Sequence, residues 1–254
     1  MKIALIGASG FVGKAIAQEL VNRGHAVTAI SRHPEQGGTG EGGTAEQGGT
    51  REGGTAKREG SREGRATEQV GSREGGIAGR IVGVKGDVFD VDRMVGLLRG
   101  HDAVVSAYNP GWTNPEIYAD SMRGSRAIQE AVKKSGVKRL IVIGGAGSLY
   151  IKPGVQLVDT PQFPAEYKAG ATAARDYLDE IRKEKEFDWT FFSPAILMNH
   201  ETAGVRRGAY RLGLENPVFD EKGVSLLSVE DLAMVIVDEL ENPKHIKQRF
   251  TAGY

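Results

Sequence analysis

The feature that most constrains this chain is its first stretch, IALIGASGFVGKAI, which covers residues 3–16. An apolar run over 2–6 predicts a buried strand, and apolar side chains at helical spacing predict a helix over 11–22. Between the two, glycines stand at 7, 10 and 13. Such a triplet allows a sharp exit from the strand, a close approach of the backbone to an anion, and tight packing of the helix. The turn therefore predicts phosphate binding at the helix N-terminus, with strand–helix packing alone as the alternative.

The rest of the chain alternates short apolar runs with longer helical patterns. Further strands are predicted over 25–31, 80–87, 102–107, 138–144, 189–193 and 249–253, and further helices over 91–98, 115–135, 165–185 and 228–240. Strands that are apolar along their whole length are typical of a parallel sheet buried on both faces. We therefore expect an α/β fold, a doubly wound parallel sheet with helices on both faces and a small C-terminal cap region over 197–227. Ligands of such sheets bind at the carboxyl ends of the strands.

One segment cannot contribute to this core. Over residues 36–76 the tripeptide GGT occurs four times, and the only apolar side chains are Ala45, Ala56, Ala66 and Val70. Abundant glycine with few apolar groups predicts a solvated, disordered segment. With 254 residues and 39% apolar content the chain can bury one substantial core. We expect a single domain over 1–254, interrupted by this low-complexity insertion at 36–76.

Composition narrows the class of partner. Lys and Arg together number 33, as do Asp and Glu, so no excess charge favours nucleic acid or a membrane surface. The chain has no cysteine, which excludes disulfides and thiol nucleophiles, and its 5 histidines are scattered without metal-ligand spacing. Neither GASGF nor GGAGSL forms the G-x-S-x-G turn of a hydrolase. We expect a cytoplasmic monomer or homodimer that acts on a small molecule, without nucleic acid, membrane or metal.

The end of the second strand bears on which dinucleotide is bound. A carboxylate there binds the ribose 2′-hydroxyl of NAD, whereas an arginine accommodates the 2′-phosphate of NADP. Here the strand ends in Ser31, Arg32 and His33, with no acidic residue before Glu35. Arg32 supplies a planar, permanently charged fork for a phosphate, and Ser31 supplies a hydroxyl. This favours NADP(H) over NAD(H), with an ordinary solvated arginine as the alternative.

Several segments together carry a resemblance to a known family. They are the glycine triplet over 7–13, Ser31-Arg32, GDVFD (86–90), SAYNPG (106–111), GGAGSL (144–149), VDTPQFPAEYK (158–168) and Ser193-Pro194. In these the chain resembles the atypical short-chain dehydrogenase/reductase superfamily. It is most similar to its small bacterial NAD(P)H-binding oxidoreductases, a group like the NADPH-dependent flavin and biliverdin reductases and the nitrogen-metabolite-repression regulators. The resemblance implies a Rossmann fold that binds NADP(H).

The resemblance also implies roles for particular residues. It places Gly7, Ala8, Ser9, Gly10, Phe11, Val12 and Gly13 at the pyrophosphate, Arg32 with Ser31 at the 2′-phosphate, and Asp87 and Val88 at the adenine. It places Ser106, Ala107 and Tyr108 on the nicotinamide-ribose side, with Gly145, Gly147 and Ser148 at the reacting end. Asn109, Gly147 and Trp112 are expected to contact the substrate, although Trp112 could equally anchor its loop.

The catalytic motif of the superfamily is incomplete. Its Tyr-x-x-x-Lys pairs a proton-donating tyrosine with a lysine whose charge lowers the tyrosine pKa and which binds ribose hydroxyls. Tyr167 matches the tyrosine, but Ala171 stands at the lysine position, and Lys168 points about 100° away on a helix unless it swings back to the cofactor. An enzyme would take its proton from Tyr167, Ser148 or water.

We therefore expect an NADPH-dependent oxidoreductase that transfers hydride to a small planar acceptor of flavin, quinone or tetrapyrrole type, because such acceptors gain little from a strong acid. The alternatives are a non-catalytic NADP(H)-binding redox sensor and a sugar-nucleotide epimerase/dehydratase-like enzyme. The short chain and the incomplete motif weigh against the epimerase.

Overall fold

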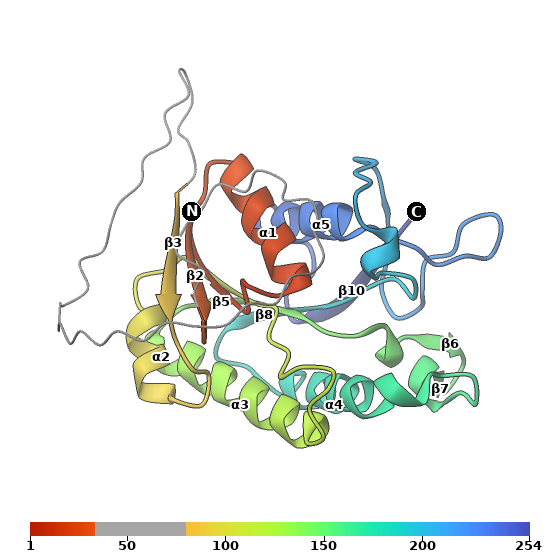
Figure 1. Ribbon diagram of the computed structural model, residues 1–254, viewed down its shortest axis with the longest axis horizontal. Coiled ribbons are helices and arrows are strands. Elements are labelled where there is room, and N and C mark those ends of the chain that lie inside the picture. Colours follow the sequence, from red (N-terminus) through yellow and green to blue (C-terminus); the bar gives the residue numbers. More distant parts are fainter. Residues whose placement is uncertain (34–79) are drawn as a thin grey trace, which may run out of the picture.

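A computed structural model describes residues 1–33 and 80–254, and it places an eight-stranded sheet at the centre of this part of the chain (Figure 1). The strand order is β3-β2-β1-β4-β5-β8-β10-β9. The strands are β1 (Lys2–Ile6), β2 (Ala26–Ser31), β3 (Ile81–Lys85), β4 (Ala103–Ser106), β5 (Arg139–Ile143), β8 (Asp188–Ser193), β9 (Arg211–Gly213) and β10 (Gln248–Gly253). All neighbouring strands of this sheet are parallel except β9 and β10. From β1 the chain first adds β2 and β3 on one side and then adds β4, β5 and β8 on the other, as in a doubly wound sheet.

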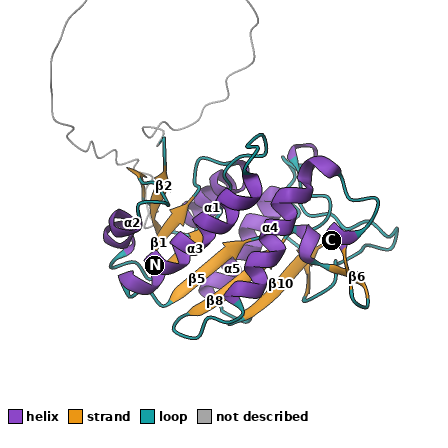
Figure 2. Ribbon diagram, turned by 90° about the horizontal axis from the view of Figure 1, so that it is seen from below, coloured by secondary structure: helices purple, strands orange, loops and turns teal. Residues whose placement is uncertain are grey.

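Helices cover both faces of the sheet. They are α1 (Phe11–Asn22), α2 (Val91–Leu98), α3 (Ile117–Ser135), α4 (Ala165–Ile181) and α5 (Val229–Glu241). Figure 1 shows α1 and α5 on one side of the strands and α2, α3 and α4 on the other. Figure 2 shows the first residue beside β1 and the last residue beyond β10.

The side chains of β1 show why the strand is apolar from Ile3 to Ile6. Ile3 and Leu5 pack in the cluster with residues of α1 and α5, while Ala4 and Ile6 pack in the cluster with residues of α2, α3 and α4. All four are at most 2% exposed. Because successive strand residues point to opposite faces, a continuous apolar run is what a sheet buried on both faces requires. The predicted fold class is confirmed.

The structure differs from the sequence prediction in its boundaries and small elements. The predicted helix over 165–185 ends at Ile181, and beyond it the Glu184 carboxylate accepts hydrogen bonds from the N–H groups of Lys185 and Glu186, both at 2.7 Å. That local turn replaces the last helical bonds. The short hairpin β6 (Tyr150–Lys152) and β7 (Val155–Gln156) was not predicted.

The expected cap over 197–227 contains the edge strand β9 and a 3₁₀ turn, η3 (His200–Thr202). An isolated bridge between Leu197 and Leu226 ties its two ends together. The predicted insertion at 36–76 lies outside the described residues. Among the described residues, no helix is both long and apolar enough to span a bilayer.

Candidate nucleotide-binding edge

The glycine turn joins β1 to α1 and lies against the next strand loop. Gly7 has φ +79° and donates its N–H to Ile30 O at 3.0 Å, and a Cβ at this position would be 2.5 Å from Ala107 O. A Cβ at Gly13 would be 2.1 Å from the oxygen of Gly7. Backbone packing therefore requires these two glycines. Gly10 differs, since its Cβ would meet only one atom within contact range, at 3.4 Å. Packing alone does not account for Gly10, which fits a backbone kept bare for a ligand.

The N-terminus of α1 has the character of an anion cradle. Its first backbone bond runs from Lys14 N–H to Gly10 O at 2.9 Å, so the N–H groups of Phe11, Val12 and Gly13 precede any helical partner. Gly10 provides no side-chain cap, and the first turn holds no acidic residue. The helix dipole and these N–H groups together favour a phosphate here. The residues predicted at the pyrophosphate form the turn and the start of α1; of them Ser9 and Gly10 are exposed, whereas Ala8 and Gly13 are buried.

Beside this turn, the ends of β2 and β3 lie next to each other, at the place where the sequence predicts the adenosine of the cofactor. Gly86 donates its N–H to Ser31 O at 3.0 Å, which holds the loop after β3 against the end of β2. Arg32 follows directly and is exposed. Asp87 forms a local turn, because its Oδ1 accepts the N–H of Phe89 at 3.0 Å. The structure therefore groups Ser31, Arg32, Asp87 and Val88 at one edge.

The electrostatics of Tyr108 show which charges share this edge. Burial raises the pKa of the Tyr108 hydroxyl to about 12, and the carboxylates of Asp120 and Asp87 add to the increase. The guanidinium groups of Arg32 and Arg123 oppose it. Arg32 and Asp87, which lie on different strand loops, are therefore close enough to act on the same hydroxyl.

The Tyr108 side chain itself requires a correction to the prediction. Its ring packs on α3, where a Cβ at Gly124 would be 2.3 Å from it, and its hydroxyl donates to Asp120 O at 3.1 Å. Ser106 is also buried, at 5% exposure, within the end of β4. The backbone of Ala107 and Tyr108 lies against the glycine turn, whereas the half-buried Tyr108 ring packs on α3. At the glycine turn these residues therefore present main-chain atoms.

Ser148 likewise does not face an open site. It lies in the 3₁₀ turn η1 (Ala146–Ser148) and is 0% exposed. Its hydroxyl donates to Gly145 O at 3.0 Å and is 3.1 Å from Ser193 Oγ, while the Arg249 guanidinium donates to its carbonyl at 3.1 Å. The expectation that Ser148 supplies a proton is therefore not supported, because the hydroxyl is enclosed by the protein's own hydrogen bonds.

Tyr167 and Trp112 form an exposed aromatic pair at the same edge of the sheet. Tyr167 lies in the first turn of α4 and is 46% exposed, and Trp112 lies in the loop after β4 and is 53% exposed. Their ring centroids are 5.2 Å apart in an edge-to-face arrangement. The Trp112 ring also lies over Gly170, so it both anchors its loop on α4 and presents a surface. Lys168, beside Tyr167, is exposed.

The position of the missing lysine is a packing contact. Ala171 is 7% exposed, and its Cβ would be 2.9 Å from a Cβ at Gly147. Gly145 makes a similar approach to α4, where Ala174 Cβ would lie at 3.6 Å. Small residues therefore let α4 lie directly on the turn after β5. Of the predicted substrate residues, Gly147 is buried in this contact, and Asn109 is exposed with its Oδ1 accepting the N–H of Gly111 at 2.7 Å.

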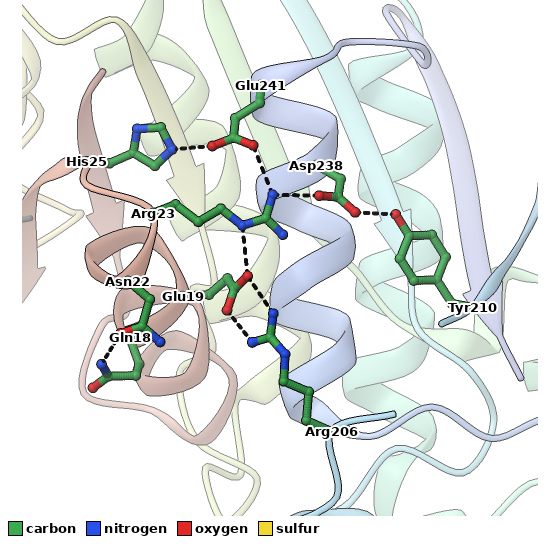
Figure 3. Close-up of polar contacts among 9 residues, drawn as sticks. All are labelled: Gln18, Glu19, Asn22, Arg23, His25, Arg206, Tyr210, Asp238 and Glu241. Atoms are coloured by element: carbon green, nitrogen blue, oxygen red, sulfur yellow. Dashed lines mark hydrogen bonds and ion pairs between the residues drawn. The ribbon is translucent and has the colours of Figure 1, made fainter. Parts of the chain in front are cut away.

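The first part of the expected cap region contacts α1. We call residues 199–210 the strap. Its His200 ring lies 4.1 Å from the ring of Phe11, the residue that follows Gly10 of the glycine turn. Arg206 makes a two-armed contact with the Glu19 carboxylate of α1, which also accepts Arg23 Nε at 2.8 Å (Figure 3). The Glu19 side chain is only 4% exposed. In the sequence, the only sign of this contact is an acidic residue, Glu19, on the face of α1 that is buried. Its partner Arg206 cannot be inferred from local spacing, because it lies 187 residues away.

Carboxylates of α5 hold the rest of the strap. The buried Asp231 accepts the N–H groups of Arg207 and Gly208 at 2.8 and 3.0 Å, and Glu230 accepts the N–H of Gly204 at 2.8 Å. Figure 3 shows Arg23 between α1 and α5, in contact with carboxylates of both helices. The strap is thus fixed to the two helices that flank the glycine turn.

Comparison with known proteins shows the family of the chain. Residues 65–243 match the model of the NAD(P)H-binding family. The chain is 31% identical to the Bacillus subtilis protein YwnB, over 99% of this chain and 97% of that one.

Among the solved structures that match over the whole of this chain are two with provisional functional names and at least 33% identity. One is a Bacteroides thetaiotaomicron protein provisionally named an epimerase, with 40% identity, 96% of its chain covered and a TM-score of 0.77. The other is a Streptococcus pneumoniae protein provisionally named an NADH-flavin reductase, with 33% identity, 99% of its chain covered and a TM-score of 0.72. The cradle at Gly10, the arginine after β2 and these matches lead to one assignment: the chain belongs to the NAD(P)H-binding family.

Proposed function

We propose that this protein is an NADPH-dependent oxidoreductase that passes hydride to a small planar acceptor of flavin, quinone or tetrapyrrole type. The observation that carries the proposal is the exposed Tyr167–Trp112 pair, which lies where the loops after β4 and β5 meet α4. In a doubly wound sheet this carboxyl edge is where the reacting end of a dinucleotide lies. An aromatic surface beside a hydroxyl suits a flat acceptor that must be both oriented and protonated.

The parts of the site divide the work between binding and chemistry. The glycine turn and the N-terminus of α1 would hold the pyrophosphate, and Arg32 would hold the 2′-phosphate. Bound NADPH supplies the hydride. Trp112 would support the face of the acceptor, and the Tyr167 hydroxyl would donate the proton that accompanies reduction. Because Ala171 replaces the lysine of the superfamily motif, no ammonium assists Tyr167 from that position.

The Streptococcus relative supports a flavin-type acceptor through its provisional name, at 33% identity. The Bacteroides relative is provisionally named an epimerase at 40% identity. We favour reduction, since epimerisation through a tyrosine base would depend on the lysine that this chain lacks. A redox sensor that binds NADP(H) without turnover remains the second candidate, and the same absent lysine is the observation that favours it.

The test is NADPH oxidation by the purified full chain with FMN, a benzoquinone and biliverdin, followed by near-ultraviolet absorbance. We expect turnover with at least one acceptor and a lower rate in Tyr167→Phe. Tyr118→Phe is the matched control, since Tyr118 is an exposed tyrosine on α3 that bonds Asp176. Tight NADPH binding without turnover on any acceptor would establish the sensor. Equal activity in both variants would remove Tyr167 from the chemistry.

A further inference from the structure

An arginine on α3 stands over the loop that follows β3. Phe89 in this loop is 39% exposed, and the guanidinium carbon of Arg123 lies 4.0 Å from the centre of its ring. Arg123 Nη2 also contacts Asp120 Oδ1 at 3.0 Å. One face of the guanidinium is therefore fixed against an aromatic ring, and one edge is paired. The side chain is still 66% exposed, which leaves donors free to meet a ligand.

This arginine lies on the adenosine side of the candidate site. The loop that carries Phe89 begins at Gly86, whose N–H is bonded to Ser31 O, and Ser31 immediately precedes Arg32. Arg32 and Arg123 thus approach one edge from β2 and from α3. Their shared influence on the Tyr108 hydroxyl, described above, agrees with this placement.

We propose that Arg123 is a second specificity-determining residue for NADP(H), which contacts the phosphate on the adenosine ribose together with Arg32. This inference rests on the proposed preference for NADPH. A 2′-phosphate carries about two negative charges and offers three acceptor oxygens, more than one exposed arginine can satisfy. Phe89 holds the Arg123 guanidinium in a fixed orientation, so less side-chain freedom is lost on binding than for a solvated arginine.

The experiment is calorimetric titration of the full chain with NADP⁺ and, separately, with NAD⁺. In Arg123→Ala we expect NADP⁺ affinity to fall about tenfold while NAD⁺ affinity is unchanged, because only NADP⁺ brings the phosphate. Arg123→Lys keeps the charge without the planar fork and should fall between the two. Phe89→Leu keeps Arg123 but removes the aromatic support, and it should weaken NADP⁺ binding selectively.

Arg126→Ala is the matched control. Arg126 lies three residues along α3, is 58% exposed and pairs with Glu180, so its removal changes net charge equally without touching this edge. We expect it to leave both affinities unchanged. An equal loss of NADP⁺ and NAD⁺ affinity in Arg123→Ala would overturn the proposal in favour of an adenine contact, and no loss would overturn it outright.

The proposed NADPH preference and the role of Arg123 can be refuted separately. If the unmodified chain does not prefer NADP⁺ and Arg32→Ala changes nothing, the proposed NADPH dependence itself is wrong. If the chain prefers NADP⁺ and Arg32→Ala abolishes that preference while Arg123→Ala retains it, only the role of Arg123 is wrong.

Discussion

The contact between Glu19 and Arg206 should be a measurable part of the stability of this protein. Glu19→Gln keeps the size of the side chain but removes the charge that meets Arg206 and Arg23. Hydrogen bonds to charged groups contribute about 1.5–3 kcal/mol each, and breaking a buried pair costs more. Here the cost is reduced, since Arg206 is 47% exposed and Arg23 retains Asp238 at 2.6 Å and Glu241 at 2.9 Å. We expect a loss of about 2 kcal/mol, which lowers the melting temperature of a chain this size by about 4–8 °C.

A double-mutant cycle isolates the pair from its surroundings. Urea unfolding of Glu19→Gln, Arg206→Ala and the double variant should give a coupling of about 1 kcal/mol. The matched control is Glu130 with Lys134, an exposed pair within α3 at 2.7 Å whose side chains are 52% and 53% exposed. Solvent screening should leave no measurable coupling there. If both cycles give the same coupling, burial does not strengthen the Glu19 contact and the reasoning is refuted.

The pH dependence gives a second, independent check on Glu19. The hydrogen bond from Arg206 holds the pKa of the Glu19 carboxyl below its usual 4.5, although burial opposes the shift and Arg23 assists it. A carboxyl with a lowered pKa in the folded state stabilises the fold above its usual pKa and loses that contribution as pH falls through the lowered value. The gap in stability between the unmodified chain and Glu19→Gln should therefore be constant near neutrality and narrow below about pH 4.5. A constant gap down to pH 3 would contradict this assignment.

Three further substitutions test other parts of the structure. Gly13→Ala places a Cβ 2.1 Å from a backbone oxygen of the glycine turn and should abolish dinucleotide binding in a titration. Gly96→Ala in α2, where no atom lies within 4 Å of the added Cβ, should instead raise the melting temperature. If the two variants gave the same dinucleotide affinity and the same melting temperature, the packing at Gly13 would not matter. Tyr108→Phe should remove an ionisation near pH 12 that ultraviolet absorbance detects. Because the raised pKa of Tyr108 favours the neutral hydroxyl in the folded state, its contribution to the free energy of unfolding should persist below pH 10 and disappear toward pH 12. Ala171→Lys should destabilise the fold by about 2 kcal/mol through burial of an amine against Gly147, without increasing NADPH oxidation; a gain in turnover would show that α4 can accommodate the lysine.

The parts of the fold that could be predicted are those that short-range patterns encode. The apolar run from Ile3 to Ile6 is visible in the sequence because each of these side chains is buried on one face of the sheet or the other. The glycine turn is visible because two backbone contacts exclude a side chain at Gly7 and Gly13. The helix end at Ile181 was missed, since a single carboxylate, Glu184, competes with helical bonds that propensity alone would extend.

The site was harder to predict than the fold, because its geometry depends on contacts between distant segments. Ser148 follows a strand end, as a catalytic serine would, but Arg249, 101 residues later, donates to its carbonyl and encloses it. Tyr108 has the right position in the chain, but Gly124 on α3 admits its ring and turns it away from the glycine turn. The strap depends on Arg206 reaching Glu19, and no periodicity connects these two residues.

The contact between Ala171 and Gly147 bears on the reaction itself. Because α4 rests on the turn after β5 through these two small residues, a lysine at 171 would have to leave the interface to reach a cofactor. The alanine that stands at the lysine position of the superfamily motif is therefore part of the packing of α4. The first turn of α4 offers three exposed polar groups at this edge: the Glu166 carboxylate, the Tyr167 hydroxyl and the Lys168 ammonium. If the proposed reduction occurs, its rate across a series of acceptors should follow how easily each accepts hydride and not how much acid assistance each needs, since the chain orients the acceptor with Trp112 but supplies no paired acid. A series of quinones graded by reduction potential would reveal that dependence, and turnover restricted to acceptors that require strong protonation would contradict it.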